Sequence, residues 1–230
     1  MKTFYFFMLM LGLTVLPAHA RSRIVTDTVF SKVLNSERAY SVYLPSSFEQ
    51  NVEQKYPVLY LLHGMSQTNG DWIWRGHVQE VIDRLTASGE ISEMVVIMPD
   101  AGGDIYKDNW NGYFDMPGWS YERFFYEEFL PLVEKKYRVI GDKKHRAVAG
   151  LSMGGGGATV YGLKHSDKFA AVYAMSALMT IPSQGAVRFE KPDDKIAILT
   201  CSVIENSAID YVIKSDENVR EALRSVAWFV

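Results

Sequence analysis

Two short and almost wholly apolar runs constrain the fold of this chain more than any other feature of its sequence. Residues 57–62 read Pro-Val-Leu-Tyr-Leu-Leu, and residues 94–98 read Met-Val-Val-Ile-Met. Runs of this length and composition are typical of parallel strands that are covered on both faces. The apolar residues between the two runs recur at helical spacing: Val78, Val81, Ile82 and Leu85. The sequence therefore predicts a strand, a helix and a second strand, which is the repeating unit of a parallel sheet.

The same alternation continues along the chain. Further strands are expected at residues 146–149 and 169–175, with a helix of small residues at 153–163 between them. An earlier strand at 39–44 is expected to pair antiparallel with one around 24–34. The remaining expected elements are an aromatic helix at 121–133, a helix at 206–225 and a buried strand at 226–230. We predict one α/β domain with a mostly parallel sheet and helices on both faces.

The first 20 residues have the form of a secretory signal peptide. Lys2 is followed by an apolar run at 4–16 and by Pro17, Ala18, His19 and Ala20. Because the apolar run is shorter than the ~20 residues that span a bilayer, cleavage is favoured over anchoring. We expect a secreted or periplasmic domain of residues 21–230, with no membrane partner after cleavage.

Composition narrows the range of partners. The chain of 230 residues has a net charge of -3, which gives no general attraction to nucleic acid. Cys201 is the only cysteine, so no internal disulfide can form, and we interpret it as a small buried apolar residue. The four glycines at 154–157 lack the Gly-Lys-Ser/Thr ending of a phosphate-binding loop and predict close packing of a helix. No metal and no cofactor is expected, and the oligomeric state is left open.

Residues 150–154 carry the strongest chemical signal. They read Gly-Leu-Ser-Met-Gly, placed after an expected strand and before an expected helix. This is the setting of a nucleophile elbow, in which the serine occupies a sharp turn and the glycines leave it room. The alternative is that the serine only caps the helix. We predict that Ser152 is a catalytic nucleophile.

A second loop is expected to face this elbow. The apolar run at 57–62 opens directly into His63, Gly64 and Met65. An oxyanion hole needs two amide donors, and we predict that the backbone N–H groups of Met65 and Met153 supply them. His63 precedes the serine in the chain, so we expect it to order the loop by hydrogen bonding and not to act as the base.

At these residues the chain resembles the esterase D and feruloyl esterase group of α/β-hydrolases. The likeness covers residues 24–180 and is carried by five motifs: Tyr-Leu-Leu-His-Gly-Met at 60–65, Asp71-Trp72, Pro99-Asp100, Gly-Leu-Ser-Met-Gly-Gly at 150–155 and Met175-Ser176-Ala177. The chain is most similar to secreted esterases of gut Bacteroidetes. The resemblance implies an α/β-hydrolase fold and action on esters of plant cell-wall polysaccharides.

The chain departs from this group at the rest of the catalytic triad. His165 is the only histidine after Ser152, and we expect it at the far end of the helix, in contact with terminal carbonyls. Glu205 and Asp210 are the late acidic candidates, and Asp210 is kept as a weak one. In the related enzymes the acid follows a strand such as 226–230 and the histidine comes later. We therefore expect the triad acid and histidine to lie beyond Val230, with the C-terminal part of the fold missing from this chain.

Aromatic residues suggest where a substrate would bind. Trp72, Trp110 and Trp119 are the candidates for stacking on a sugar ring or a feruloyl group, although rings of the 101–119 stretch have the alternative role of covering the sheet edge. The predicted reaction is hydrolysis of a small-molecule or polysaccharide ester through an acyl-enzyme on Ser152. Two alternatives remain open at this point. One is a catalytically inactive homologue with a binding role or none, and the other is an acyltransferase.

Overall fold

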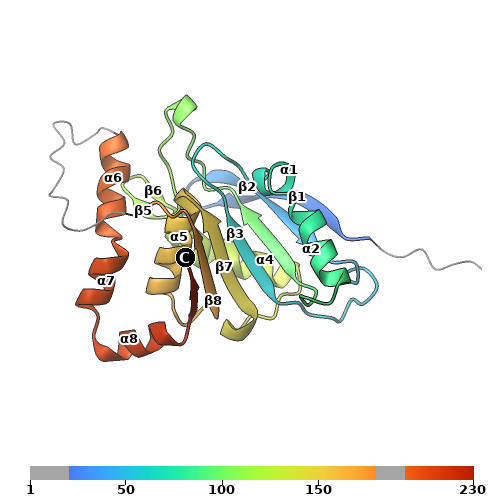
Figure 1. Cartoon of the computed structure of the whole chain (residues 1–230). Helices are drawn as coiled ribbons and strands as arrows, with labels where there is room; N and C mark the ends of the chain where they lie inside the picture. Colours follow the sequence, from blue (N-terminus) through green and yellow to red (C-terminus); the bar gives the residue numbers. More distant parts are fainter. Residues whose placement is uncertain (1–20, 180–194) are drawn as a thin grey trace, which may run out of the picture.

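The computed structural model describes residues 21–179 and 195–230, so the predicted signal peptide lies outside the described residues. A seven-stranded sheet in the order β1-β2-β4-β3-β7-β8-β9 runs through this part of the chain (Figure 1). Its strands are Arg23–Ser31 (β1), Ser36–Leu44 (β2), Val58–Leu62 (β3), Val95–Pro99 (β4), Arg146–Leu151 (β7), Ala171–Met175 (β8) and Ala227–Phe229 (β9). From β4 to β9 all neighbours are parallel. The predicted α/β class with a mostly parallel sheet is confirmed.

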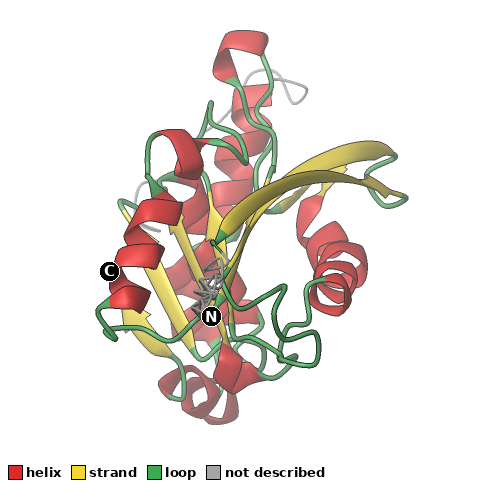
Figure 2. Cartoon of the chain, turned by 90° about the vertical axis from the view of Figure 1, so that its right-hand side faces the viewer, coloured by secondary structure: helices red, strands yellow, loops and turns green. Residues whose placement is uncertain are grey.

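Helices cover both faces of this sheet, as predicted (Figure 2). Helices α1 and α2 cover one face of the sheet over β2, β4 and β3, where Val78 and Ile82 pack on the strands. The opposite face is covered by α3, α4 and α5. The helices are Asp71–Trp74 (α1), Val78–Ala87 (α2), Tyr121–Phe124 (α3), Leu130–Lys136 (α4), Met153–Lys164 (α5), Lys195–Glu205 (α6), Ala208–Lys214 (α7) and Glu217–Arg224 (α8). Short 3-10 turns occupy Ile105–Lys107 (η1) and Lys143–His145 (η3).

The first two strands form the predicted antiparallel pair, with Val25 opposite Val42 and Arg23 opposite Leu44. β2 then pairs antiparallel with β4, which joins this hairpin to the parallel part of the sheet. The long pair curves strongly at the edge of the molecule in Figure 2. The second half of β2 is buried on both faces of the sheet: Tyr40 and Val42 belong to the core on one face and Tyr43 to the core on the other.

The aromatic helix differs from the regular helix that its spacing predicts. Between α3 and α4 the chain makes one wider turn of π-helix, Phe125–Phe129 (η2). Phe124, Phe125 and Phe129 are all buried, and Phe125 packs on Tyr161 of α5 with ring centroids 4.8 Å apart. The element thus directs all three large rings to the core side.

The last elements differ from expectation in three respects. The predicted helix at 206–225 is two helices, α7 and α8, separated at Ser215 and Asp216, and Asp216 caps α8 through its side chain. The terminal strand exists, but it forms the sheet edge and leaves Phe229 55% exposed, so its predicted burial is wrong. Cys201 is half-buried on α6, where full burial was expected.

Within residues 21–179 and 195–230, no helix is long and apolar enough to cross a membrane.

Candidate active site

Ser152 occupies a sharp turn between β7 and α5. Its φ of 54° and ψ of -112° are unusual for a residue with a side chain. It stands at the N-cap of α5, yet its side chain makes no capping hydrogen bond. The backbone holds the turn instead, since the Ser152 N–H donates to Met175 O (2.8 Å) and the Leu178 N–H donates to Ser152 O (2.8 Å). The hydroxyl is thus available for chemistry, which disfavours the capping alternative.

Two glycines make this turn possible. A Cβ on Gly150 would lie 2.1 Å from Gly154 O, and a Cβ on Gly154 would lie 2.4 Å from Leu62 O. Both distances are far below van der Waals contact, so a side chain at either position would force the backbone apart. A Cβ on Gly155 would likewise lie only 2.8 Å from Met175 O. The glycine run therefore packs α5 directly on the ends of β3 and β8, as the sequence predicted.

The loop after β3 lies beside this elbow. β3 and β7 are parallel neighbours with Leu62 opposite Gly150, so residues 63–67 leave the sheet next to Ser152. We call them the oxyanion loop after the role that the sequence predicts for Met65. The side chains of Met65 and Met153 both reach Gly103, because a Cβ on Gly103 would lie 3.0 Å from Met65 Sδ and 3.2 Å from Met153 Sδ. The Met153 N–H belongs to the first turn of α5, where amides lack intrahelical acceptors. The structure thus brings Ser152, Met65 and Met153 together.

His63 is a buried structural residue. Its Nδ1 donates to Gly64 O (2.8 Å), and its Nε2 accepts from the Ala101 N–H (3.1 Å). Both ring nitrogens are engaged by backbone groups, and the ring is fully buried. Asp100 Oδ1 is 3.6 Å from Nε2, which is beyond a hydrogen bond. These contacts agree with the prediction that His63 orders the loop and leave it no free nitrogen for a proton from Ser152.

The other three histidines of the described chain have partners of their own. His165 follows α5 and bonds Glu122 Oε1 through Nε2 (2.9 Å), so the predicted contact of its side chain with terminal carbonyls is replaced by a carboxylate. It lies thirteen positions after Ser152, which is roughly 20 Å along a helix. His145 bonds Asp142 (2.7 Å), and His77 lies 3.5 Å from Glu80. None of these three is placed to serve Ser152.

Asp210 is not placed with Ser152 either. It lies in the first turn of α7, 3.6 Å from Lys214 Nζ, in a pocket that Val160, Leu163 and Lys164 also line. Those residues form the last turns of α5, roughly 12–18 Å along the helix from Ser152. Glu205 lines the same pocket.

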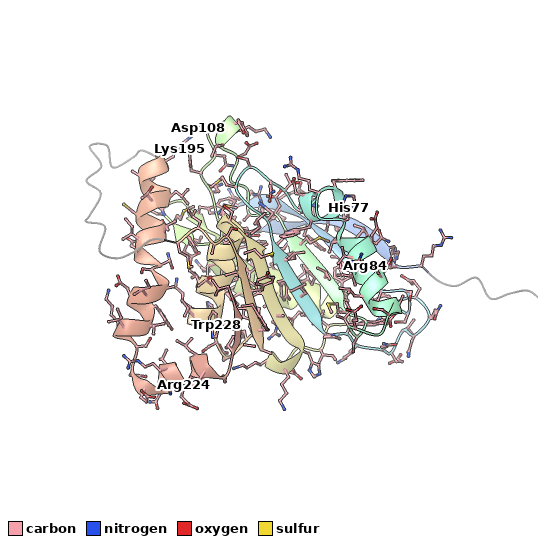
Figure 3. All side chains as sticks on the ribbon, in the orientation of Figure 1. His77, Arg84, Asp108, Lys195, Arg224 and Trp228 are labelled. Carbon is pink, nitrogen blue, oxygen red and sulfur yellow. The ribbon has the colours of Figure 1, made fainter. Side chains whose placement is uncertain are left out.

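Residues 101–119, here called the aromatic loop, form one wall of a pocket against α6. Trp110 and Trp119 line this pocket of about 370 Å³ together with Asn109, Asn111 and Lys195. Lys195 Nζ pairs with Asp108 Oδ2 at 2.6 Å and so joins the loop to α6 (Figure 3). The structure therefore brings two of the three candidate tryptophans together.

The remaining rings divide between the two roles that the sequence left open. Tyr113 and Phe114 are buried in the core, whereas Tyr106 is 87% exposed at the tip of the loop. Trp72 packs with Val78 and Ile82 on the other face of the sheet, and its Nε1 has no hydrogen-bond partner among the described residues. Trp72 thus lies apart from Trp110 and Trp119 and covers the sheet.

Several residues that support the site carry no local sequence signal. The Tyr113 hydroxyl accepts from the His63 N–H (2.8 Å), and burial raises the pKa of Tyr113 well above its usual value. Ser66 bonds two residues of the aromatic loop, and Gln67 Oε1 accepts from the Gly64 N–H (2.7 Å). Only the extreme conformation of Gly103, which has a φ of 82°, could have been suspected from its residue type.

The described residues contain no group of three or more histidine, cysteine or acidic side chains that could hold a metal ion.

Comparison with known proteins finds that the chain is similar to esterases. The model of the esterase family ("Putative esterase") matches residues 31–210. A solved ferulic acid esterase is 68% identical with a TM-score of 0.85, over 91% of this chain and 78% of that chain. The endo-1,4-beta-xylanase/feruloyl esterase of Xylanibacter ruminicola is 30% identical over 145 residues, or 62% of this chain. This chain spans only 20% of the length of that enzyme.

The expected α/β-hydrolase fold is confirmed by more distant structures. A ferulic acid esterase of Anaeromyces mucronatus, solved with ferulic acid, has a TM-score of 0.62 at 23% identity, covering 75% of this chain and 65% of that chain. At this identity the similarity concerns the fold alone.

Proposed function

Because this chain belongs to the esterase family, we propose that it is a secreted serine carboxylic-ester hydrolase that acts on feruloyl or acetyl esters of plant cell-wall polysaccharides. The observation that carries the proposal is Ser152, held at a strained turn with a hydroxyl that caps nothing. The relatives support the feruloyl group, and the form of residues 1–20 supports secretion.

The proposed reaction begins with attack of Ser152 Oγ on the ester carbonyl. The carbonyl oxygen becomes an oxyanion, which the backbone N–H groups of Met65 and Met153 stabilise. The alcohol leaves with a proton, and water then hydrolyses the acyl-enzyme to release the acid and the free serine. The base that takes the serine proton is not assigned among the described residues.

The pocket of the aromatic loop supports an aromatic or sugar-bearing substrate. Its volume of about 370 Å³ lies within the range of small-molecule sites. The indole rings of Trp110 and Trp119 offer flat apolar surface, and the side chains of Asn109 and Asn111 offer polar groups at the same pocket. We propose that this pocket holds the feruloyl ring or the sugar to which it is esterified.

A test of the proposal is loss of turnover in the Ser152→Ala variant of the full chain. The turnover of methyl ferulate and p-nitrophenyl acetate that the wild-type chain shows above the uncatalysed rate is expected to be lost, because the nucleophile is removed while the fold is kept. Ser88→Ala is the matched control, since Ser88 is an exposed serine that bonds only local groups.

The outcomes separate the proposal from its alternatives. Turnover that survives Ser152→Ala at the wild-type rate would exclude Ser152 as the nucleophile. Binding of methyl ferulate without turnover by the wild-type chain would favour the inactive homologue with a binding role. Transfer of the feruloyl group to an added sugar alcohol, in preference to water, would favour the acyltransferase.

A further inference from the structure

Ser66 lies where the oxyanion loop meets the aromatic loop, and it makes hydrogen bonds to the second loop with both its backbone and its side chain. Its backbone N–H donates to Gly103 O at 2.6 Å. Its side-chain Oγ accepts from the Ile105 N–H at 3.2 Å. One residue thus satisfies two backbone groups of a loop that begins 35 positions later in the chain. Ser66 is adjacent to Met65, so any movement of Ser66 moves the Met65 amide.

Gly103 closes the same junction from the other side. A Cβ on Gly103 would lie 2.4 Å from Asn111 O and within 3.2 Å of the sulfur atoms of Met65 and Met153. The aromatic loop therefore rests, through Gly103, on the side chains of the two residues whose amides are the proposed oxyanion donors. A shift of this loop would be transmitted to both donors, because the contact leaves no free space.

The backbone conformation of Ser66 is strained. Its φ of 60° lies in the left-handed region, which a serine adopts at an energetic cost. The cost is offset by the two bonds to the aromatic loop and by the bond from the Gly64 N–H to Gln67 Oε1 (2.7 Å). Without the bonds at Ser66, the oxyanion loop would relax toward backbone conformations that aim the Met65 N–H elsewhere.

We propose that Ser66 is a positioning residue, which locks the oxyanion loop to the aromatic loop so that the Met65 amide is aimed correctly only while the aromatic loop is seated. This inference rests on the proposed function. It makes the wall of the aromatic pocket and the oxyanion donor one hydrogen-bonded unit. A substrate that orders the aromatic loop would therefore also order the donor that stabilises its own transition state.

The test compares two substitutions at Ser66 in the full chain. Ser66→Gly removes the hydroxyl and relieves the positive φ, whereas Ser66→Asn keeps a side-chain acceptor and also tolerates the left-handed region. Hydrogen–deuterium exchange is followed in residues 64–67 and 101–106, and kcat and KM are measured for methyl ferulate and p-nitrophenyl acetate. The control is Ser88→Gly, which removes a hydroxyl far from both loops.

We expect Ser66→Gly to raise exchange about tenfold in both loops and to lower kcat about tenfold for both esters, with KM changed less than twofold. Removal of an oxyanion donor lowers kcat by roughly 10²–10³-fold, so a misplaced donor should lower kcat less than that, and by a similar factor for every ester. Ser66→Asn should keep exchange in both loops and kcat for both esters close to their wild-type values.

The inference would be overturned if Ser66→Gly left hydrogen–deuterium exchange unchanged or raised it in one loop only. It would also be overturned if exchange rose in both loops while kcat stayed unchanged. A kinetic effect limited to the KM of methyl ferulate would also contradict it, since that would mark Ser66 as a residue of the acyl pocket only. Absence of turnover in the wild-type chain would contradict the proposed function. The exchange measurement by itself would then decide whether the two loops are coupled.

Discussion

Gly154 illustrates how single residues fix the geometry of the site. Its Cα faces the carbonyl oxygens of Leu62 and His63, where an added Cβ would lie 2.4 Å and 2.6 Å away. These carbonyls belong to the end of β3, from which the oxyanion loop departs. The absence of one side chain at Gly154 thus determines how closely Ser152 approaches Met65.

We predict that Gly154→Ala destabilises the protein and reduces ester turnover together. Overpacking of this kind costs about 1–3 kcal/mol, which lowers the melting temperature by roughly 2–12 °C in a chain of this size. Gly70→Ala is the control, because a Cβ there would meet only ordinary contacts of 3.4 Å or more. Thermal unfolding followed by circular dichroism measures the first effect, and the hydrolysis assay measures the second. Equal melting temperatures for the two variants would contradict the prediction.

The residues of the site differ in how far the sequence could predict them. Ser152, Gly150 and Gly154 were predictable because the elbow is a local structure of five consecutive residues. The partners of His63 and Ser66 were not, since Ala101 and Ile105 are 38 and 39 positions away in the chain. A hydrogen bond between two loops depends on their placement by the sheet, which no local pattern records.

Among the elements, α3 and α5 are joined by a small charged cluster. Glu122 of α3 is buried and accepts from Lys164 Nζ (3.0 Å) and from His165 Nε2 (2.9 Å) at the end of α5. The His165 ring also stacks on Tyr126, with centroids 3.8 Å apart. Burial raises the pKa of Glu122, but the bonds from His165 and Lys164 outweigh it, so the pKa lies below its usual value.

We predict that this cluster makes stability depend on acid pH. Because the folded-state pKa of Glu122 is lowered, its stabilisation is complete above the usual glutamate pKa of about 4.3 and is lost as pH falls through the folded value. Glu122→Gln should cost about 2 kcal/mol at pH 7, or roughly 4–8 °C in melting temperature, and less at pH 3.5. At pH 3.5, which is below the usual glutamate pKa, the carboxyl of the unfolded chain is mostly protonated, so part of the stabilisation is already lost.

Glu127→Gln provides the comparison for this measurement, because Glu127 pairs with Arg123 on the surface of the same helix. Exposed pairs contribute little, so this variant should match the wild type at both pH values. A melting-temperature difference for Glu122→Gln that is the same at pH 7 and pH 3.5 would show that charge plays no part.

The elements themselves were predicted where hydrophobic periodicity is strong. Strands β3 and β4, helix α2 and helix α5 agree with expectation within one or two residues. The π-turn at Phe125–Phe129 was not predictable, because consecutive large rings satisfy several helical periods equally well. The edge position of β9 was missed for a related reason: an apolar run of five residues is the same in a central strand and in an edge strand.

At the scale of the molecule, the described residues cover the two faces of the sheet unequally. The face that bears α3, α4 and α5 holds the large aromatic core. On the other face α1 and α2 lie toward the β2 and β4 side, and β7 and β8 stand open to the viewer in Figure 1. A hollow of about 800 Å³ on this open side is lined almost wholly by apolar residues: Leu59, Ala147, Val148, Ala149, Ala171, Val172, Tyr173, Trp228, Phe229 and Val230.

We predict that this open face drives self-association of the chain. Tyr173 and Phe229 are 48% and 55% exposed and form an edge-to-face ring pair with centroids 6.2 Å apart. A continuous exposed patch of this kind favours association, whereas a single exposed ring does not. The double variant Tyr173→Ser, Phe229→Ser should therefore sediment at a coefficient that depends less on concentration than that of the wild type. Tyr106→Ser is the matched control, because Tyr106 is more exposed but stands alone on the aromatic loop. If the control reduced association as much as the double variant, the open face of the sheet would not be the surface responsible.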